Sequence, residues 1–259
     1  MKIIVCIKQV PDSAATIIVE NGLATWPDAS LVANPWDEFA IEAALVEKEK
    51  HGGEVIALSI GPEVAKEALK FAMAMGCSEA ALVLRPEPQS SDGQMTARIL
   101  AAAINKIGGA DLVIMGKQAI DTDMGTTAAQ VARILKWPAL TLVSSIELID
   151  PEARLIRIER AFEEGRQVLE SRLPAVVSVV KDIGKPRYPS FMGIRKAQTA
   201  PIQTWSAADL GLAPTEPAVH CIEVMEPPQR QVSTEIIKGQ SPQETAESLV
   251  EKILAEKII

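Results

Sequence analysis

The chain has 259 residues, 47% of them apolar, so it is long enough to bury a sizeable core within one large domain. Its formal net charge of −8 argues against nucleic acid as a general partner, because phosphate backbones attract basic surfaces. No apolar run approaches the roughly 20 residues that cross a bilayer, no signal-peptide pattern opens the chain and the three cysteines show no CxxC spacing, so we expect a cytoplasmic protein without membrane insertion.

Continuous apolar runs, each short enough for a buried parallel strand, alternate with helical patterns as far as residue 180. The runs are Ile3–Ile7, Val55–Ile60, Ala80–Leu84, Leu112–Met115, Leu140–Val143 and Ala175–Val180. Helices are expected between them over residues 35–50, 62–75, 94–107 and 126–135. This alternation predicts an α/β fold with a doubly wound, mostly parallel sheet, whose ligands bind beyond the carboxyl ends of the strands.

Two parts of the chain depart from that alternation. Near the N-terminus, Ile17–Val19, a turn at Asn21-Gly22 and Leu23–Trp26 have the form of a hairpin. Later, apolar and polar residues alternate along three consecutive segments, which predicts an antiparallel excursion of the sheet with one face in water. These segments are Ser145–Asp150, Leu155–Arg160 and Gln167–Ser171.

The composition changes after the last parallel strand, so residues 1–183 are predicted to form the α/β domain. Residues 184–200 are expected to form a loop or helix for partner recognition. They are basic and carry four exposed-looking apolar side chains, which suits docking of an acidic partner, although residue type alone also fits packing into the core. The four are Tyr188, Phe191, Met192 and Ile194. Residues 201–259 are expected to form an extended, proline-rich arm ending in an amphipathic helix over Pro242–Lys257, which would pack on a partner subunit.

The stretch from Asp111 to Gln130 carries the main functional signal. A buried strand breaks at Gly116 into a polar loop, and the following helix begins near Gly125, Thr126 and Thr127. Because the first N–H groups of a helix lack internal partners, they can bind a phosphate, while Gln118 and the loop carboxylates suit an adenine or a ribose. The alternative is that these residues only cap the helix. A P-loop does not fit, because the sequence departs from the P-loop pattern at two positions.

Several motifs occur in one order along nearly the whole chain. They are MKIIVCIKQVPD at the N-terminus, NPWDEFAIEAAL from Asn34, GKQAIDTD from Gly116 and Pro227-Pro228-Gln229-Arg230 in the tail. The most specific is IERAFEEGRQVLESRLPAVVS, from Ile158 to Ser178, with a basic residue, an acidic pair, a Gln and a later Pro at fixed spacing. Together they resemble the β subunit of electron transfer flavoprotein.

The resemblance implies an electron carrier within a heterodimer, in which the α subunit holds most of a redox-active FAD and the β subunit binds a structural AMP. Ser13 and Trp36 match positions that approach the flavin from the β side. Phe191 matches the family's recognition loop for partner dehydrogenases. Nucleotide contacts are implied for Cys6, Asn34, Pro35, Trp36, Ile60, Gln118, Ala119, Asp121, Thr122, Asp123, Met124, Gly125, Thr126 and Thr127.

The resemblance also implies a route for the electrons, from dehydrogenases of the acyl-CoA type through FAD to a quinone oxidoreductase or another acceptor. No bond-making chemistry is expected in this chain, because the cofactor carries the redox chemistry. The loop that reads Asp121-Thr122-Asp123 and then Thr126-Thr127-Ala128 departs from the family's usual AMP loop. Electron-bifurcating relatives hold a second FAD in place of AMP and have their own variants of this loop, which this sequence fits no more closely. A second FAD is the alternative.

Two functions of other classes also fit parts of the sequence. A stand-alone adenine-nucleotide-binding protein resembling the universal stress proteins explains the sheet and the loop but leaves the C-terminal arm without a purpose. A hydrolase that holds a metal on Asp121 and Asp123 lacks a further set of ligands in the sequence.

Overall fold

The computed structural model describes residues 1–20, 22–85, 92–213, 217–219, 222–226, 228 and 234–256. The chain divides into two compact units, Met1–Val224 and Met225–Ile259. Within the described residues, no helix is both long enough and apolar enough to cross a membrane. Of the motifs noted in the sequence, Pro227, Gln229 and Arg230 lie outside the described residues, as do Asn21 and Lys257.

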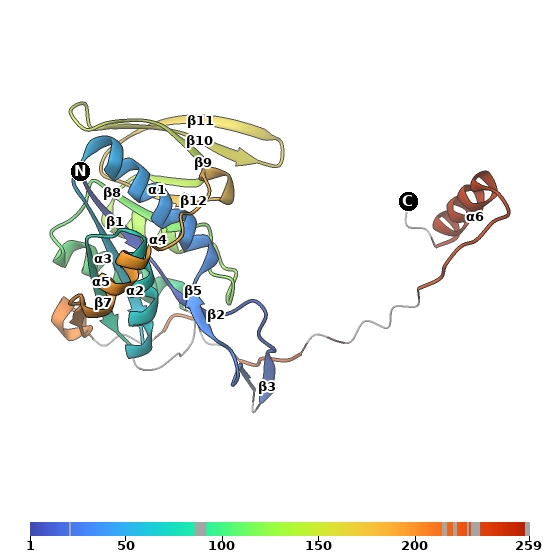
Figure 1. Cartoon of the computed structure of the whole chain (residues 1–259), viewed down its shortest axis with the longest axis horizontal. Helices are drawn as coiled ribbons and strands as arrows, with labels where there is room; N and C mark the ends of the chain where they lie inside the picture. Colours follow the sequence, from blue (N-terminus) through green and yellow to red (C-terminus); the bar gives the residue numbers. More distant parts are fainter. Residues whose placement is uncertain are drawn as a thin grey trace. The chain divides into compact units, whose positions relative to one another are not determined.

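In the described part of the chain, the first unit is built on a nine-stranded sheet with the order β11-β10-β9-β12-β8-β1-β6-β7-β13 (Figure 1). At one end of the sheet, β10 pairs antiparallel with both β9 and β11. Every other neighbouring pair in this order is parallel. The bounds are β1 Lys2–Cys6, β6 Glu54–Gly61, β7 Glu79–Leu84, β8 Leu112–Gly116, β9 Ala139–Asp150, β10 Leu155–Phe162, β11 Gly165–Arg172, β12 Ala175–Val179 and β13 Gln203–Trp205.

Helices cover both faces of this sheet because successive strand residues point to opposite sides. Ile3 and Val5 of β1 share one core with α1, Pro35–His51, and α2, Lys66–Met75. Ile4 and Cys6 of the same strand share the second core with α3, Gly93–Lys106, and α4, Thr127–Leu135. The predicted doubly wound, mostly parallel α/β fold is confirmed.

The antiparallel ribbon was also predicted, but its first strand is longer than expected. Leu140–Val143 and Ser145–Asp150 belong to one strand, β9, which pairs in parallel with β12 through its first half and antiparallel with β10 through its second. Buried Ser144 joins the halves, and its hydroxyl donates to Glu159 O at 3.2 Å. Because no turn residue separates the two patterns, the change of pairing partner occurs within a continuous strand.

Some of the short strands were not predicted from the sequence. The predicted hairpin is present as β3, Ile18–Glu20, and β4, Leu23–Thr25. Beside it, β2, Gln9–Pro11, pairs with β5, Leu31–Ala33, and neither strand was expected. A 3₁₀ turn over Glu63–Ala65 precedes α2, where the helix was expected to begin at once. Strands of three residues are too short to show an alternating pattern.

The region after residue 183 contains a helix within residues 184–200, where a loop or helix was expected, and an edge strand that was not expected. Helix α5 spans Phe191–Thr199, and β13 adds an edge strand beside β7 where an extended arm was expected to begin. Short 3₁₀ turns lie at Lys181–Ile183 and Ala208–Leu210. In the second unit, α6 spans Pro242–Ala255, and the Ser241 hydroxyl caps it as expected.

Candidate functional site

The strand order places the candidate site between β1 and β8. From β1, the chain first winds outward through β6 and β7 and then returns to the other side of β1 with β8. Ligands of open α/β sheets bind beyond the carboxyl ends of the strands at such a reversal. Here those ends are Cys6 and Gly116, and the β8–α4 loop, residues 117–126, follows directly.

Asp37, in the first turn of α1, joins the ends of both strands. Its buried carboxylate accepts a hydrogen bond from Lys8 N at 2.8 Å and another from Gly116 N at 3.1 Å. Burial raises the pKa of Asp37 to about 7, and the two N–H groups oppose that rise by favouring the charged form. A Cβ atom on Gly116 would lie 2.5 Å from Asp37 Oδ1 and from the backbone carbon of Trp36, so only glycine permits this approach.

Asn34 holds the β8–α4 loop from beneath. Its side chain is only 1% exposed, donates from Nδ2 to Gln118 O at 2.8 Å and accepts from Ile120 N at 3.2 Å. The amide thereby meets one acceptor and one donor of the loop backbone, as a buried polar group requires. The structure thus gives Asn34 a contact with the loop, and the nucleotide contact implied for it stays a prediction, as does that of exposed Pro35.

Side chains on the solvent side of the loop are paired with one another. Lys8 Nζ lies 2.6 Å from an oxygen of Asp121, and Gln118 Nε2 donates to Asp123 Oδ1. Lys117 Nζ lies 5.6 Å from the centre of the Trp36 ring, a distance at which a cation attracts an aromatic face. Both loop carboxylates already have partners, which does not favour the alternative of a metal-dependent hydrolase.

The start of α4 offers backbone donors. Helix α4 begins after Thr126, whose side chain makes no capping hydrogen bond, and Gly125 has a φ of +63° that favours glycine. Among the described residues, no acceptor is found for the backbone N–H groups of residues 124–129. Exposed Thr122 and Met124 and half-buried Ala119 and Thr127 lie along the same loop and helix start. This arrangement matches an anion site at a helix N-terminus.

The remaining predicted contact residues lie on neighbouring strands. Cys6 is buried at the end of β1, where burial raises the pKa of its thiol, so it remains neutral. Ile60 is half-buried near the end of β6. The preceding residue, Ser59, is fully buried, and its hydroxyl has no hydrogen-bond partner among the described residues. Ser59 was not predicted from the sequence. The signal that could have identified it is a single serine within an apolar run.

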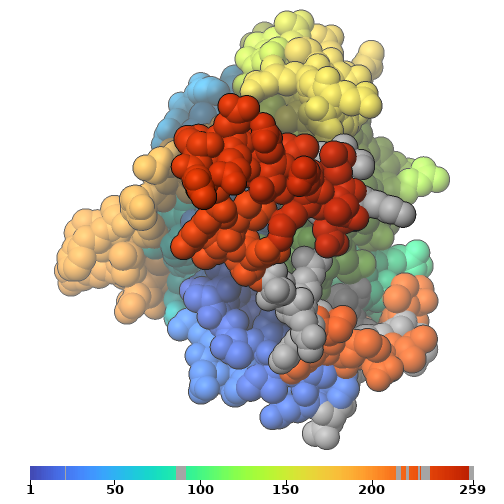
Figure 2. All heavy atoms as spheres, turned by 90° about the vertical axis from the view of Figure 1, so that its right-hand side faces the viewer, coloured from blue at the N-terminus to red at the C-terminus, as the bar shows by residue number. Residues whose placement is uncertain are grey.

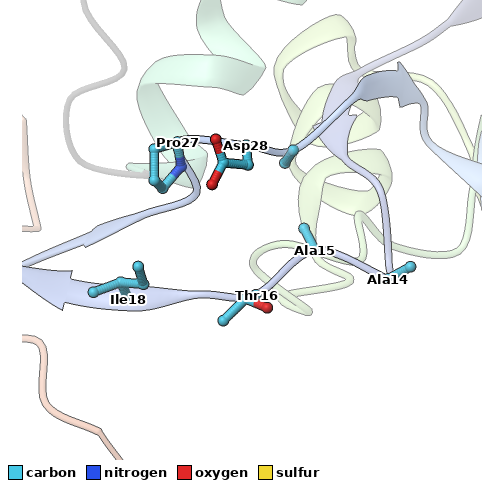
Figure 3. Close-up of a pocket in the computed structure, with 7 residues that line it drawn as sticks. Ala14, Ala15, Thr16, Ile18, Pro27 and Asp28 are labelled. Carbon is cyan, nitrogen blue, oxygen red and sulfur yellow. The ribbon is translucent and has the colours of Figure 1, made fainter.

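Ser13, predicted to face the flavin, lies in a different part of the first unit. It is exposed in the connection between β2 and β3. The next residues line a hollow of about 230 Å³, in which Ala14, Ala15 and Thr16 lie on one side and Pro27 and Asp28 on the other (Figure 3). The flavin contact of Ser13 stays a prediction.

The predicted partner-recognition residues are all on the surface. Tyr188 is 87% exposed, Phe191 80% and Met192 70%, and Ile194 is also exposed. These four residues form what we call the α5 apolar patch. The interpretation that they tuck into the core is therefore wrong. The segment that contains α5, amber in Figure 2, stands out at the left edge of the molecule in that view.

The chain is similar to proteins of one known family. The profile of the electron transfer flavoprotein domain matches residues 28–210. The caffeyl-CoA reductase-Etf complex subunit CarD of Acetobacterium woodii is 37% identical, and the match covers 100% of both chains. The electron transfer flavoprotein subunit beta of Bacillus subtilis is 32% identical over 99% of this chain and 98% of its own length. Protein FixA of Azorhizobium caulinodans is 38% identical over 82% of this chain and 77% of its own.

Proposed function

Because the chain belongs to the β-subunit family of electron transfer flavoproteins, we propose that it is the β subunit of a heterodimer that carries electrons from acyl-CoA-type dehydrogenases to a quinone oxidoreductase or another acceptor. An electron-transfer role beside an α subunit, and involvement of a flavin, follow from the family itself. The nature of the redox partners and of the nucleotide on this chain is our proposal. A relative that is named as part of a caffeyl-CoA reductase complex supports an acyl-CoA-type partner.

The observation that carries the proposal is the β8–α4 loop. Asn34 holds the loop backbone and Asp37 holds Gly116 at the end of β8, while the N–H groups of residues 124–129 are left without protein acceptors in the described part of the chain. Fixed donors at the positive end of a helix dipole bind a phosphate without first having to be ordered. The hydroxyls of Thr126 and Thr127 add two donors at the same place.

The donor set therefore fits the phosphate of AMP, which we propose is held here as a structural nucleotide. Both loop carboxylates are engaged, Asp121 with Lys8 and Asp123 with Gln118, so their repulsion of a phosphate is reduced. The half-buried Trp36 ring beside Lys117 closes the same edge of the sheet. FAD, held mainly by the α subunit, supplies the electron transfer, and this chain supplies position and electrostatics.

A second FAD in place of AMP is the alternative nucleotide, and it would make the protein part of an electron-bifurcating type. The order Asp121-Thr122-Asp123 in the loop fits neither the AMP-type pattern nor the variants of bifurcating relatives closely, so the loop sequence leaves both nucleotides open. AMP and FAD both present an adenosine phosphate, so the donors at α4 serve either. The two candidates differ in the number of flavins per heterodimer.

The test is to purify the chain together with its α subunit, release the nucleotides by denaturation and count them. One FAD and one AMP per heterodimer would support the proposal, and two FAD with no AMP would support the alternative. A heterodimer that releases only the FAD of the α subunit would contradict a nucleotide at the β8–α4 loop. A chain that is stable, colourless and monomeric without any partner would instead favour the stand-alone nucleotide-binding protein.

A further inference from the structure

Helix α5 turns its small residues toward the body and its large apolar residues toward solvent. A Cβ atom on Gly193 would lie 2.2 Å from Ala74 O, so the helix backbone sits directly on the last turn of α2. Ala197 is the one buried residue of the nine in this fully described helix. Helices shorter than about 12 residues are marginal on their own, and an alanine and a glycine bury little apolar area. Packing on α2 therefore buries only the small face of α5.

Arg187, four residues before the helix, supplies a second, polar attachment. Its Nε donates to Glu42 Oε2 at 2.8 Å and its Nη2 to Glu42 Oε1 at 2.9 Å, while its Nη1 donates to Glu49 Oε1 at 2.6 Å. Its backbone N–H also donates to Glu42 Oε2 at 3.0 Å. Both carboxylates belong to α1, seven residues apart, which places them two turns apart on one face. One guanidinium thereby joins the start of α5 to α1.

The other polar residues of this connection do not reach the body. The Ser190 hydroxyl accepts from Gly193 N within α5 itself, at 2.9 Å. Across residues 184–190, all of them described, Arg187 is the residue whose side chain forms ion pairs with another element. Glu42 is mostly shielded from water, with 12% of its side chain exposed, so this pair is less screened than a surface ion pair.

We propose that Arg187 is the positioning residue of the docking site. Its ion pairs with Glu42 and Glu49 fix the start of α5 on α1, so that the α5 apolar patch meets a redox partner in one orientation. The inference rests on the proposed function, and it adds the docking proposal that the α5 apolar patch is the surface on which the dehydrogenase docks. The planar fork of arginine satisfies two carboxylates at once, which a lysine ammonium cannot do with the same geometry.

The first test uses the heterodimer with an acyl-CoA dehydrogenase and its saturated acyl-CoA as the electron donor. In Arg187→Gln we expect the KM for the electron transfer flavoprotein to rise about tenfold with kcat changed less than about twofold, because binding now has to order α5. The KM of Arg187→Lys should lie between those of Arg187→Gln and the wild type. Arg154→Gln, which breaks a surface ion pair with Asp111 on another part of the chain, is the matched control and should leave KM unchanged.

A double variant separates positioning from direct contact. If Arg187 acts by placing Phe191, then Arg187→Gln added to Phe191→Ala should raise KM by less than about twofold beyond Phe191→Ala alone. A fully additive effect would mean that Arg187 touches the partner, and an unchanged KM in Arg187→Gln would mean that it does not position the site. Either result overturns the inference and leaves the docking proposal standing. If Phe191→Ala itself leaves KM unchanged, the docking proposal fails instead.

Amide hydrogen exchange provides a readout that needs no partner dehydrogenase. In Arg187→Gln, amides of α5 should exchange about tenfold faster or more, while those of α3 and α4 should keep their wild-type rates. Wild-type exchange rates in α5 of this variant would overturn the inference. Faster exchange throughout the chain would show a general loss of stability, and it too would contradict a role confined to α5.

Discussion

The β8–α4 loop and helix α5 both lie on the surface of the first unit, but they are held in opposite ways. Buried Asn34 holds the loop backbone, buried Asp37 holds Gly116 just before the loop, and the N–H groups of residues 124–129 have no acceptor among the described residues. Helix α5 is fixed at one end by Arg187 and leaves large apolar side chains in water. The first arrangement suits a charged ligand that needs preset donors, and the second suits an apolar protein surface.

This difference predicts that substitutions beneath the loop act on stability, whereas substitutions in the α5 apolar patch act on partner binding.

The largest effect is expected for Gly116→Ala. The new Cβ would meet Asp37 Oδ1 and the Trp36 backbone at 2.5 Å, and backbone atoms at a helix start cannot move aside. We expect the free energy of unfolding to fall by about 3 kcal/mol, measured by urea denaturation. Gly93→Ala is the matched control, because its Cβ would meet the flexible end of Gln130 at 3.0 Å, and it should change stability much less.

The next effect is expected for Asn34→Ala. It leaves Gln118 O and Ile120 N without their partner in a poorly solvated place, which should lower the free energy of unfolding by about 2 kcal/mol. Asn105→Ala, at an exposed position in the last turn of α3, is the control and should stay within about 0.5 kcal/mol of the wild type. Equal stability of both variants would show that the loop does not depend on Asn34.

Asp37 gives the loop a dependence on pH whose sign can be worked out. Its pKa in the folded chain is raised from 3.8 to about 7, so between these values the folded state holds a proton that the unfolded state has lost. Stability from this group is therefore present at low pH and decreases as the pH rises toward 7, by up to about 1.4 kcal/mol per pH unit. The difference in unfolding free energy between the wild type and Asp37→Asn should fall between pH 5 and pH 7. A constant difference would contradict the raised pKa.

The smallest effect on stability is expected for Phe191→Ala. The ring is 80% exposed, so its loss should change the free energy of unfolding by less than about 0.5 kcal/mol while electron transfer from the dehydrogenase slows. Phe162→Ala, in the ribbon strand β10, removes a partly exposed ring elsewhere and serves as the control for transfer kinetics. If Phe191→Ala were destabilised and its transfer kinetics normal, the α5 apolar patch would act on stability and not on partner binding.

The two regions also differ in how much of each could be predicted from the sequence. Apolar runs and the polar break at Gly116 were enough to predict the parallel strands, the loop and the start of α4, since these signals are local. The exposure of Phe191 could be expected only from the resemblance to the family. The contacts of Asn34 and Asp37 join residues about 80 positions apart, and no local pattern reports which backbone groups a buried side chain will meet. Strand β13 was missed because three residues carry no period.

The central claim is that a nucleotide lies at the β8–α4 loop in a site built by the residues beneath it. Its most direct test is the amount of nucleotide released per heterodimer from the wild type, Asn34→Ala and Asn105→Ala under conditions in which all three are folded. We predict one adenine nucleotide beyond the FAD of the α subunit in the wild type and in Asn105→Ala, and clearly less than one in Asn34→Ala. Release of the full amount from folded Asn34→Ala, or of none from the wild type, would contradict the account.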